Sequence, residues 1–203
     1  GIELKKYLCS IFDMLFLYLK ALNFKEMTKY YRYIPLEIPV SYTVFKNPIG
    51  LTGLIASSTG LLRIIYKLSN EDSMENYLAQ STHAKTTKSP SEFKELIKQF
   101  LKYFKGNLKN FDFPLDLRLG TQFQQKVWKK LNTIPYGKTR SYKWIASAIN
   151  NPQASRAVGN ANGRNPLAIL IPCHRVIREN GELGGYTGGI NIKRFLLNLE
   201  QAN

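Results

Sequence analysis

Cysteine and histidine are scarce in this 203-residue chain, which has two of each. Two cysteines cannot build the disulfide framework of a small secreted protein. Four such residues are also a poor supply for a structural zinc site, since Cys9 lies in an apolar N-terminal stretch and His83 in a polar segment. The most apolar stretch, residues 8–22, is interrupted by Asp13 and Lys20 and is too short to span a bilayer comfortably. We therefore expect no metal site and no stable membrane insertion.

Acidic residues are also few, with 14 against 29 lysines and arginines, and the formal net charge is +15. Such a surplus favours an anionic partner, nucleic acid first and an acidic membrane second. Lysines on a solvated surface need no partner, so the nine arginines are more informative. Six of them follow residue 139, and residues 115–203 contain 13 basic and 4 acidic side chains. The basic character is concentrated in the C-terminal half.

Residues 1–41 form an N-terminal extension to which we assign no function. Residues 8–22 lack the small-residue cleavage pattern of a signal peptide. Three interpretations stay open: an extra docking helix, a membrane-surface helix, or sequence upstream of a true start near Met27.

Residues 42–114 are expected to form a small α+β supporting domain. Strands flank turns at Asn47–Gly50 and Ser58–Gly60, and residues 69–89 read as a loop or weak helix. The apolar spacing of residues 93–104 predicts a helix that ends near Gly106. Alternating apolar residues from 111 to 119 indicate a strand or an extended linker.

Residues 115–203 are expected to form a mainly helical domain. Thr121 and Gln124 make a capping box before one helix. Ser141 caps a second helix with an apolar face of Trp144, Ile145, Ala148 and Ile149, and Asn151 with Pro152 begins a third. The last two helices have helix-turn-helix proportions, and the small residues of the third would allow close approach to a DNA groove. An ordinary αα-hairpin fits the pattern equally well.

A candidate nucleophile, Cys173, follows the apolar run 165–171 and precedes His174 and Arg175. A nearby cation lowers the pKa of a thiol, and a base within reach activates it. Zinc binding and Cys–His hydrolase chemistry are the rival uses. The second is disfavoured because adjacent side chains point apart on a regular strand.

The sequence around Cys173 resembles the O6-alkylguanine-DNA alkyltransferases. The resemblance is carried by several segments in the family's order, among them 139–142, 155–161, 163–166, 172–176, 185–189 and a closing helix with Lys193 and Glu200. It implies an α+β protein with a ribonuclease-H-like N-terminal domain followed by a helix-turn-helix domain with the active-site cysteine. Coverage is strong from residue 120 to 200 and looser from 43 to 119.

The resemblance also implies a role for each matching residue. Cys173 would accept the alkyl group, His174 would take the thiol proton through a water, and Glu200 would orient His174. Asn165 would form a hinge between the recognition helix and the active-site strand. The guanine would be bound by Tyr142, by the carbonyls of Cys173 and Val176, and by Tyr186 and Thr187, the last at a position where the family often has Ser. DNA would be contacted by Tyr142, Ser155, Arg156, Arg164 and Arg175, with Arg156 filling the gap left by the extruded base.

The implied activity is direct repair of double-stranded DNA that carries O6-alkylguanine, and O4-alkylthymine as a further substrate class. The resemblance also implies that the helix pair enters the minor groove of DNA. The base edges in this groove distinguish the four base pairs poorly, so binding independent of sequence is expected. The product would be a thioether at Cys173, and the thiol is not regenerated from it because a thiolate is a poor leaving group from carbon. The transfer is therefore expected to be stoichiometric, free of cofactor and inactivating. We expect a cytoplasmic monomer. The alternative is a non-catalytic lesion-binding or regulatory helix-turn-helix protein of the same fold.

Overall fold

The computed structural model describes residues 37–201. The apolar stretch 8–22 and the possible start at Met27 lie outside the described residues. Within the described part, no helix is both long and apolar enough to cross a membrane.

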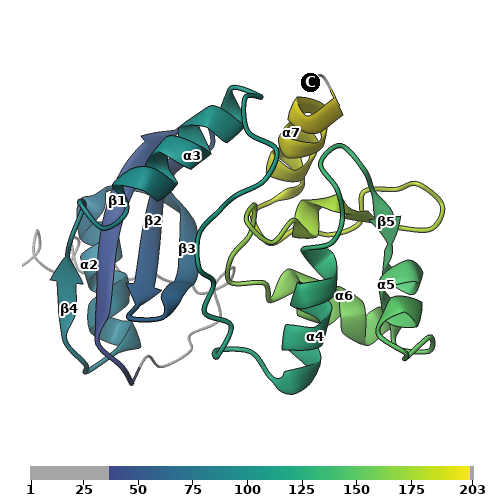
Figure 1. The fold of residues 1–203 in the computed structure, drawn as a ribbon, viewed down its shortest axis with the longest axis horizontal. Coiled ribbons are helices and arrows are strands. Elements are labelled where there is room, and N and C mark those ends of the chain that lie inside the picture. The colour runs from purple at the N-terminus through teal and green to yellow at the C-terminus, as the bar shows by residue number, and fades with distance from the viewer. Residues whose placement is uncertain (1–36, 202–203) are drawn as a thin grey trace, which may run out of the picture. The chain divides into compact units, whose positions relative to one another are not determined.

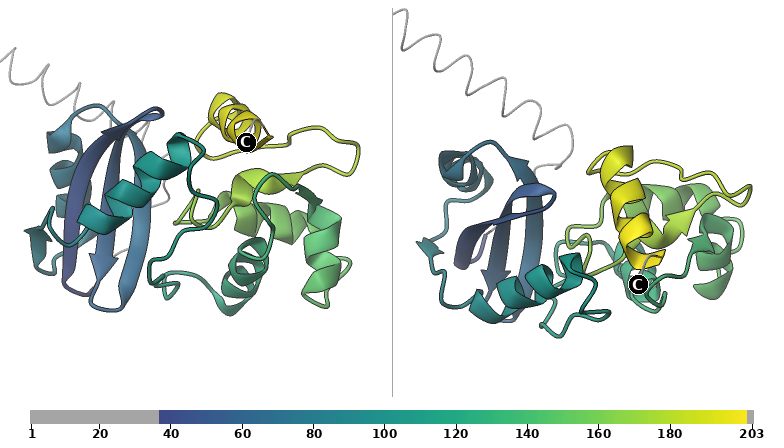
Figure 2. Two further views of the ribbon diagram at one scale, coloured as in Figure 1. Left: turned by 45° about the horizontal axis from the view of Figure 1, so that its top comes forward. Right: turned by 90° about the horizontal axis from the view of Figure 1, so that it is seen from above.

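The first half of the described chain is a four-stranded sheet with a helix on each face (Figures 1 and 2). The strand order is β3-β2-β1-β4, with antiparallel pairing except between β1 and β4. The elements are β1 (Val40–Asn47), β2 (Gly50–Ser57), β3 (Gly60–Leu68), α2 (Glu71–Ser81), β4 (Thr86–Lys88) and α3 (Lys94–Phe104). The mixed α+β class is confirmed.

Both predicted turns join strands in the expected register, with Asn47 opposite Gly50 and Ser57 opposite Gly60. The prediction for residues 69–89 is correct for helix α2, whose N-terminus is capped by Asn70, but it missed the short strand β4. Helix α3 ends as expected, with Gly106 at a φ of +75° directly after the C-cap residue.

Strand β3 lies at the edge of the sheet, yet nearly all of its residues are buried. Its backbone is covered by later parts of the chain: Leu61 N–H donates to the Pro114 carbonyl, and Ile64 N–H donates to the Pro166 carbonyl. Residues 111–119 are an extended linker rather than a strand, with a single bridge between Leu115 and Leu61. The edge of the sheet is thereby held against the segment that leads to Cys173.

The second half is mainly helical. Its elements are α4 (Gln122–Leu131), β5 (Arg140–Ser141), α5 (Tyr142–Ala148), α6 (Ser155–Gly163), the short 3-10 helix η1 (Cys173–Arg175), β6 (Val176–Ile177) and α7 (Ile190–Gln201).

The start of α4 has the expected capping box: Gln124 N–H donates to Thr121, and the Gln124 side chain accepts from Thr121 N–H. Ser141 caps α5 as predicted. Buried Trp128 donates from Nε1 to the Ala161 carbonyl at 2.8 Å, which ties α4 to α6.

Two details of the predicted helix pair are wrong. The third helix begins at Ser155 rather than at Pro152, because residues 151–154 form a turn in which Ala154 N–H donates to the Asn151 carbonyl. The buried face of α5 consists of Ile145 and Ala146. Trp144 is 38% exposed and lies beside Lys130 and Arg140 at cation–π distances.

Candidate functional site

Cys173 begins a single turn of 3-10 helix rather than lying on a strand. Its N–H donates to the Ile171 carbonyl at 2.8 Å, and Arg175 N–H donates to the Pro172 carbonyl at 3.0 Å. The argument against Cys–His hydrolase chemistry assumed that Cys173 and His174 lie on a regular strand, so it does not hold for this structure. The preceding loop contains Ile169 at a φ of +78°, a costly conformation for a β-branched residue, and burial of its side chain holds it there.

The Cys173 thiol is buried, with 4% of the residue exposed. Burial raises the pKa of the thiol, while hydrogen bonding to Asn165, the charge of Lys193 and hydrogen bonding to Tyr186 act in the opposite direction. The expectation that a neighbouring cation lowers the thiol pKa is wrong in its net direction, because burial outweighs the charge of Lys193 and the hydrogen bonds. The Arg175 guanidinium, for its part, is paired with Glu200. An accepting base is therefore needed to form the thiolate.

His174 lies next in the chain and is fully buried against Glu200. Nε2 is 2.8 Å from Glu200 Oε1, and Nδ1 has no hydrogen-bond partner within residues 37–201. Desolvation lowers the pKa of His174 and outweighs the carboxylate. Since the carboxylate is ionised, Nε2 carries the proton and donates, which leaves the Nδ1 lone pair as the acceptor.

Glu200 accepts hydrogen bonds on both carboxylate oxygens and is 3% exposed. Arg175 donates from Nε to Oε2 at 2.8 Å and from Nη2 to Oε1 at 2.9 Å. Gly137 N–H donates to Oε2 at 3.1 Å. Hydrogen bonds from His174 and Arg175 outweigh desolvation and lower the pKa of Glu200 to about 2. The carboxylate is therefore a fixed anion at neutral pH.

The predicted DNA contact by Arg175 is wrong, because this side chain is an internal support. Arg175 is 5% exposed, and its remaining Nη1 donates to the Ile134 carbonyl at 2.6 Å. Its guanidinium also lies over the Tyr136 ring at 5.6 Å. Each of the three guanidinium nitrogens donates inside the protein, and burial keeps the side chain away from a phosphate.

Asn165 and the carbonyls of Cys173 and Val176, which the sequence analysis assigned to the site, all make hydrogen bonds near the thiol. Asn165 donates from Nδ2 to the Ile171 carbonyl at 2.7 Å and accepts from Leu167 N–H at 3.0 Å, so it bridges the end of α6 and the cysteine segment. The Val176 carbonyl, a predicted guanine contact, accepts from buried Lys193 at 2.5 Å. The Cys173 carbonyl accepts from Asn162 Nδ2 at 3.4 Å.

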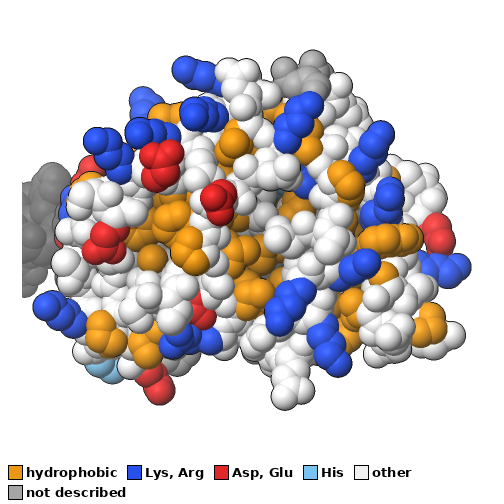
Figure 3. Space-filling view, viewed as in Figure 1, with side chains coloured by type: hydrophobic (Ala, Val, Ile, Leu, Met, Phe, Trp, Pro, Cys, Tyr) orange, Lys and Arg blue, Asp and Glu red, His pale blue; other side chains and the backbone are white. Residues whose placement is uncertain are grey.

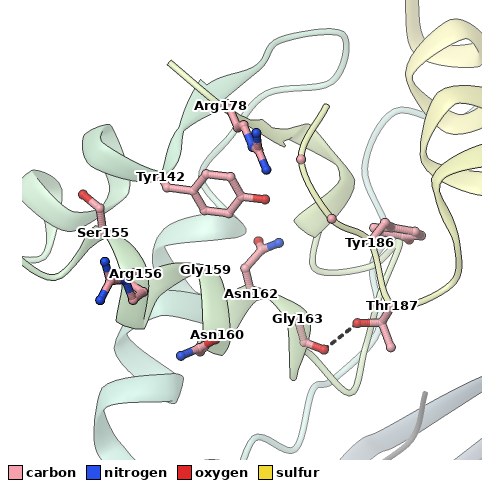
Figure 4. Close-up of a pocket in the computed structure, with 12 residues that line it drawn as sticks. Tyr142, Ser155, Arg156, Gly159, Asn160, Asn162, Gly163, Arg178, Tyr186 and Thr187 are labelled. Atoms are coloured by element: carbon pink, nitrogen blue, oxygen red, sulfur yellow. Dashed lines mark hydrogen bonds between the residues drawn. The ribbon is translucent and has the colours of Figure 1, made fainter. Parts of the chain in front are cut away.

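A pocket of about 680 Å³ opens beside these residues, between α6 and the loop 184–187 (Figure 4). In Figure 4 the Tyr142 ring points across the pocket, with Ser155 and Arg156 on one side and Tyr186 and Thr187 on the other. Thr187 donates to the Gly163 carbonyl at 2.5 Å and so links the loop to α6. Cys173 lies behind the wall, in contact with the lining residues Asn162 and Tyr186.

Five predicted site residues line this pocket: Tyr142, Ser155, Arg156, Tyr186 and Thr187. Arg164 does not, since it stands exposed at the C-terminal end of α6. Sequence reasoning missed two further lining residues, Asn162 and Arg178. A polar Asn162 on the otherwise apolar buried face of α6 is the signal that was available for the first.

Lys and Arg side chains are spread over the helical part of the face shown in Figure 3, where acidic side chains are sparse. A buried cysteine with a His–Glu pair behind it, beside a pocket formed by the helix pair α5–α6 and the loop 184–187, is the arrangement of a protein that uses a thiol as a nucleophile on a bound substrate.

Comparison with known proteins identifies the family. Residues 122–202 match the model of the 6-O-methylguanine DNA methyltransferase DNA-binding domain, and residues 40–117 match the model of the ribonuclease-like domain of the same protein. The chain therefore belongs to the O6-methylguanine DNA methyltransferase family.

Relatives and solved structures agree. The chain is 48% identical over 165 residues to the methylated-DNA–protein-cysteine methyltransferase of Mycobacterium tuberculosis, covering 80% of this chain and 93% of the relative. It is 44% identical to the constitutive enzyme of Bacillus subtilis, covering 79% and 94%. The crystal structure of Mycobacterium tuberculosis OGT in complex with DNA superposes with a TM-score of 0.68 at 45% identity, covering 80% and 94%.

Proposed function

We propose that this protein repairs DNA by transferring the alkyl group of O6-alkylguanine to Cys173. The observation that carries the proposal is the buried arrangement of Cys173, His174 and Glu200 directly behind the helix-turn-helix pocket. The protein is a methylated-DNA–protein-cysteine S-methyltransferase that acts once, and double-stranded DNA with the lesion is its partner. O4-alkylthymine is a further substrate class.

The reaction begins with loss of the thiol proton. A water on His174 Nδ1 carries this proton to the imidazole, while Glu200 accepts from Nε2 and holds the ring in orientation. The Cys173 thiolate then attacks the alkyl carbon. The S–C bond forms as the C–O6 bond breaks, and the electron pair moves onto the guanine. Tyr142, whose pKa is raised mainly by burial, stays protonated and donates to the departing base.

The pocket residues bind the extruded nucleotide. Tyr186 and Thr187 line the guanine site, and Asn165 fixes the segment that carries the thiol. The carbonyls of Cys173 and Val176, which already accept from Asn162 and Lys193, accept from the guanine amino group through their second lone pairs. Arg156, at the exposed start of α6, fills the gap in the base stack, while Ser155 and Arg164 contact the DNA backbone. No step requires a cofactor or a metal.

The chain is organised as an extension (residues 1–41), a supporting domain (42–114) and a DNA-binding, alkyl-accepting domain (115–203). The linker that leaves α3 and reaches α4 supports this division. We further propose that the protein is a cytoplasmic monomer.

Mass spectrometry of the intact protein, after mixing with duplex DNA that contains one O6-methylguanine, tests the proposal. We expect a gain of one methyl group, mapped to Cys173 and absent from Cys173→Ala. Cys9→Ala, which removes the other cysteine of the chain, is the matched control and keeps the gain. Tight lesion binding without a mass gain would favour a lesion-binding protein, and repair of many lesions per protein would refute the stoichiometric reaction.

A further inference from the structure

The carboxylate of Glu200 receives a hydrogen bond from the sheet domain as well as from its own half of the chain. The donor is the Tyr103 hydroxyl, which lies 2.7 Å from Oε1. The same oxygen accepts from His174 at 2.8 Å and from Arg175 at 2.9 Å. Tyr103 and His174 therefore share one acceptor atom.

Tyr103 lies on α3 and is fully buried. Burial, first, and then the negative charge of Glu200 raise the pKa of its phenol, so the hydroxyl stays protonated and donates. The Tyr103 ring packs against Phe104, Phe111 and Tyr136. A phenylalanine would fill this apolar space equally well, so packing alone does not explain the hydroxyl.

We infer that Tyr103 is a positioning residue for the alkyl transfer, by which the N-terminal domain holds the Glu200 oxygen that orients His174. The inference rests on the proposed function of Cys173 and His174. Tyr103 touches neither the thiol nor the pocket, and it acts only through Glu200.

Because Tyr103 and His174 share Glu200 Oε1, loss of the Tyr103 hydroxyl should shift the pKa of His174 in a defined direction. A hydrogen bond from Tyr103 draws electron density from Oε1 and weakens its attraction for the imidazole N–H. Without the hydroxyl, Oε1 interacts more strongly with His174, which favours protonated imidazole. The carboxylate also loses one of the contacts that fix its orientation.

The groups that act on His174 come from each packed element. Glu200 and Lys193 lie on α7, and Arg175 and Cys173 belong to η1. Tyr136, from the loop after α4, packs against both Tyr103 and Arg175. Of these groups, only Glu200 loses a hydrogen bond when the Tyr103 hydroxyl is removed, so a shift at His174 reports a change that passes through Glu200.

Tyr103→Phe tests the inference with two measurements on the full chain. The imidazole signals of His174 are titrated by NMR, with His83 as an internal reference. The single-turnover rate of methyl transfer from O6-methylguanine duplex is measured against pH. We expect the pKa of His174 to rise by about 0.5 unit, the acidic limb of the rate profile to move with it, and the plateau rate to fall about 3- to 10-fold.

Tyr77→Phe is the matched control. It removes another buried hydroxyl of the same domain. This hydroxyl accepts a hydrogen bond from Arg63 and makes none to Glu200. It is expected to lower stability without moving the pKa of His174. The effect of Tyr103→Phe on that pKa should also vanish in a Glu200→Gln background. If Tyr103→Phe leaves the His174 titration and the rate profile unchanged, Tyr103 is only structural and the inference is wrong.

If Tyr103→Phe does not fold, 3-fluorotyrosine at position 103 replaces it. This residue keeps the ring and donates more strongly, so the pKa of His174 should then fall, and an unchanged pKa overturns the inference. Failure of the proposed function is separate, since wild-type protein would then gain no methyl group while the NMR titration still tests the Tyr103–Glu200–His174 contact.

Discussion

Replacing Glu200 with glutamine should destabilise the protein strongly at neutral pH and weakly in acid. The pKa of Glu200 is lowered from 4.5 to about 2 by its hydrogen bonds to His174 and Arg175. At about 1.4 kcal/mol per pKa unit, this corresponds to about 3 kcal/mol of folding free energy at pH 7. The variant also leaves the buried Arg175 guanidinium without its counter-charge, and breaking such a pair costs about 3–5 kcal/mol. The two figures agree.

The pH dependence has a fixed sign. A carboxyl whose pKa is lowered on folding contributes stability above its unfolded value of 4.5, and this contribution is lost as the pH falls toward about 2. Urea unfolding of both proteins should therefore show a difference of about 3 kcal/mol at pH 7 that shrinks to about 1.4 kcal/mol at pH 3. Glu182→Gln is the control, because its pair with Arg178 is exposed and is worth less than about 1 kcal/mol. A Glu200→Gln effect below about 1 kcal/mol, or one of equal size at both pH values, would refute the reasoning.

Two further changes separate DNA binding from folding. Arg156 is exposed and makes no hydrogen bond or ion pair with any residue from 37 to 201, so Arg156→Ala should leave stability within about 0.5 kcal/mol. It should slow transfer from duplex DNA about tenfold or more, while the rate of transfer from the free base O6-methylguanine stays unchanged. Equal slowing on both substrates would contradict the stacking role. Arg194→Ala is the matched control. Gly120→Ala would place a methyl group 2.2 Å from the Trp128 ring and should cost about 1–3 kcal/mol in urea unfolding. Gly185→Ala, which has nothing within 4 Å, should cost little, and equal effects of the two substitutions would contradict the steric account.

Local patterns were sufficient to predict much of the fold. The turns at Asn47–Gly50 and Ser58–Gly60, the capping box at Thr121 and the cap at Ser141 involve residues a few positions apart, so their hydrogen bonds can be read from the chain. The start of α6 was misplaced because Asn-Pro begins turns as well as helices, and here the turn formed. Strand β4 was missed because its three residues are exposed and have no apolar pattern.

The site could be predicted only in part, because its electrostatics depend on contacts between distant residues. Arg175 follows the reactive cysteine by two positions and was expected to act on DNA, but Glu200 and the Ile134 carbonyl bind it inside the protein. Tyr103 lies 97 residues from Glu200 in the sequence, within an apolar helix pattern that a phenylalanine would satisfy equally well. A fully buried phenol needs a partner, and this requirement is the one signal that the sequence offers for it.

These distant contacts assign the sheet domain a part in the chemistry. Its edge strand binds the cysteine segment through the hydrogen bond from Ile64 to Pro166, and the Tyr66 hydroxyl donates to the Ala168 carbonyl. Its helix α3 reaches the far side of the site through Tyr103. The segment before Cys173 and the carboxylate behind His174 are therefore fixed from the same domain. A thiol with a raised pKa depends on the geometry of its base, and in this chain the N-terminal domain stabilises that geometry from both sides.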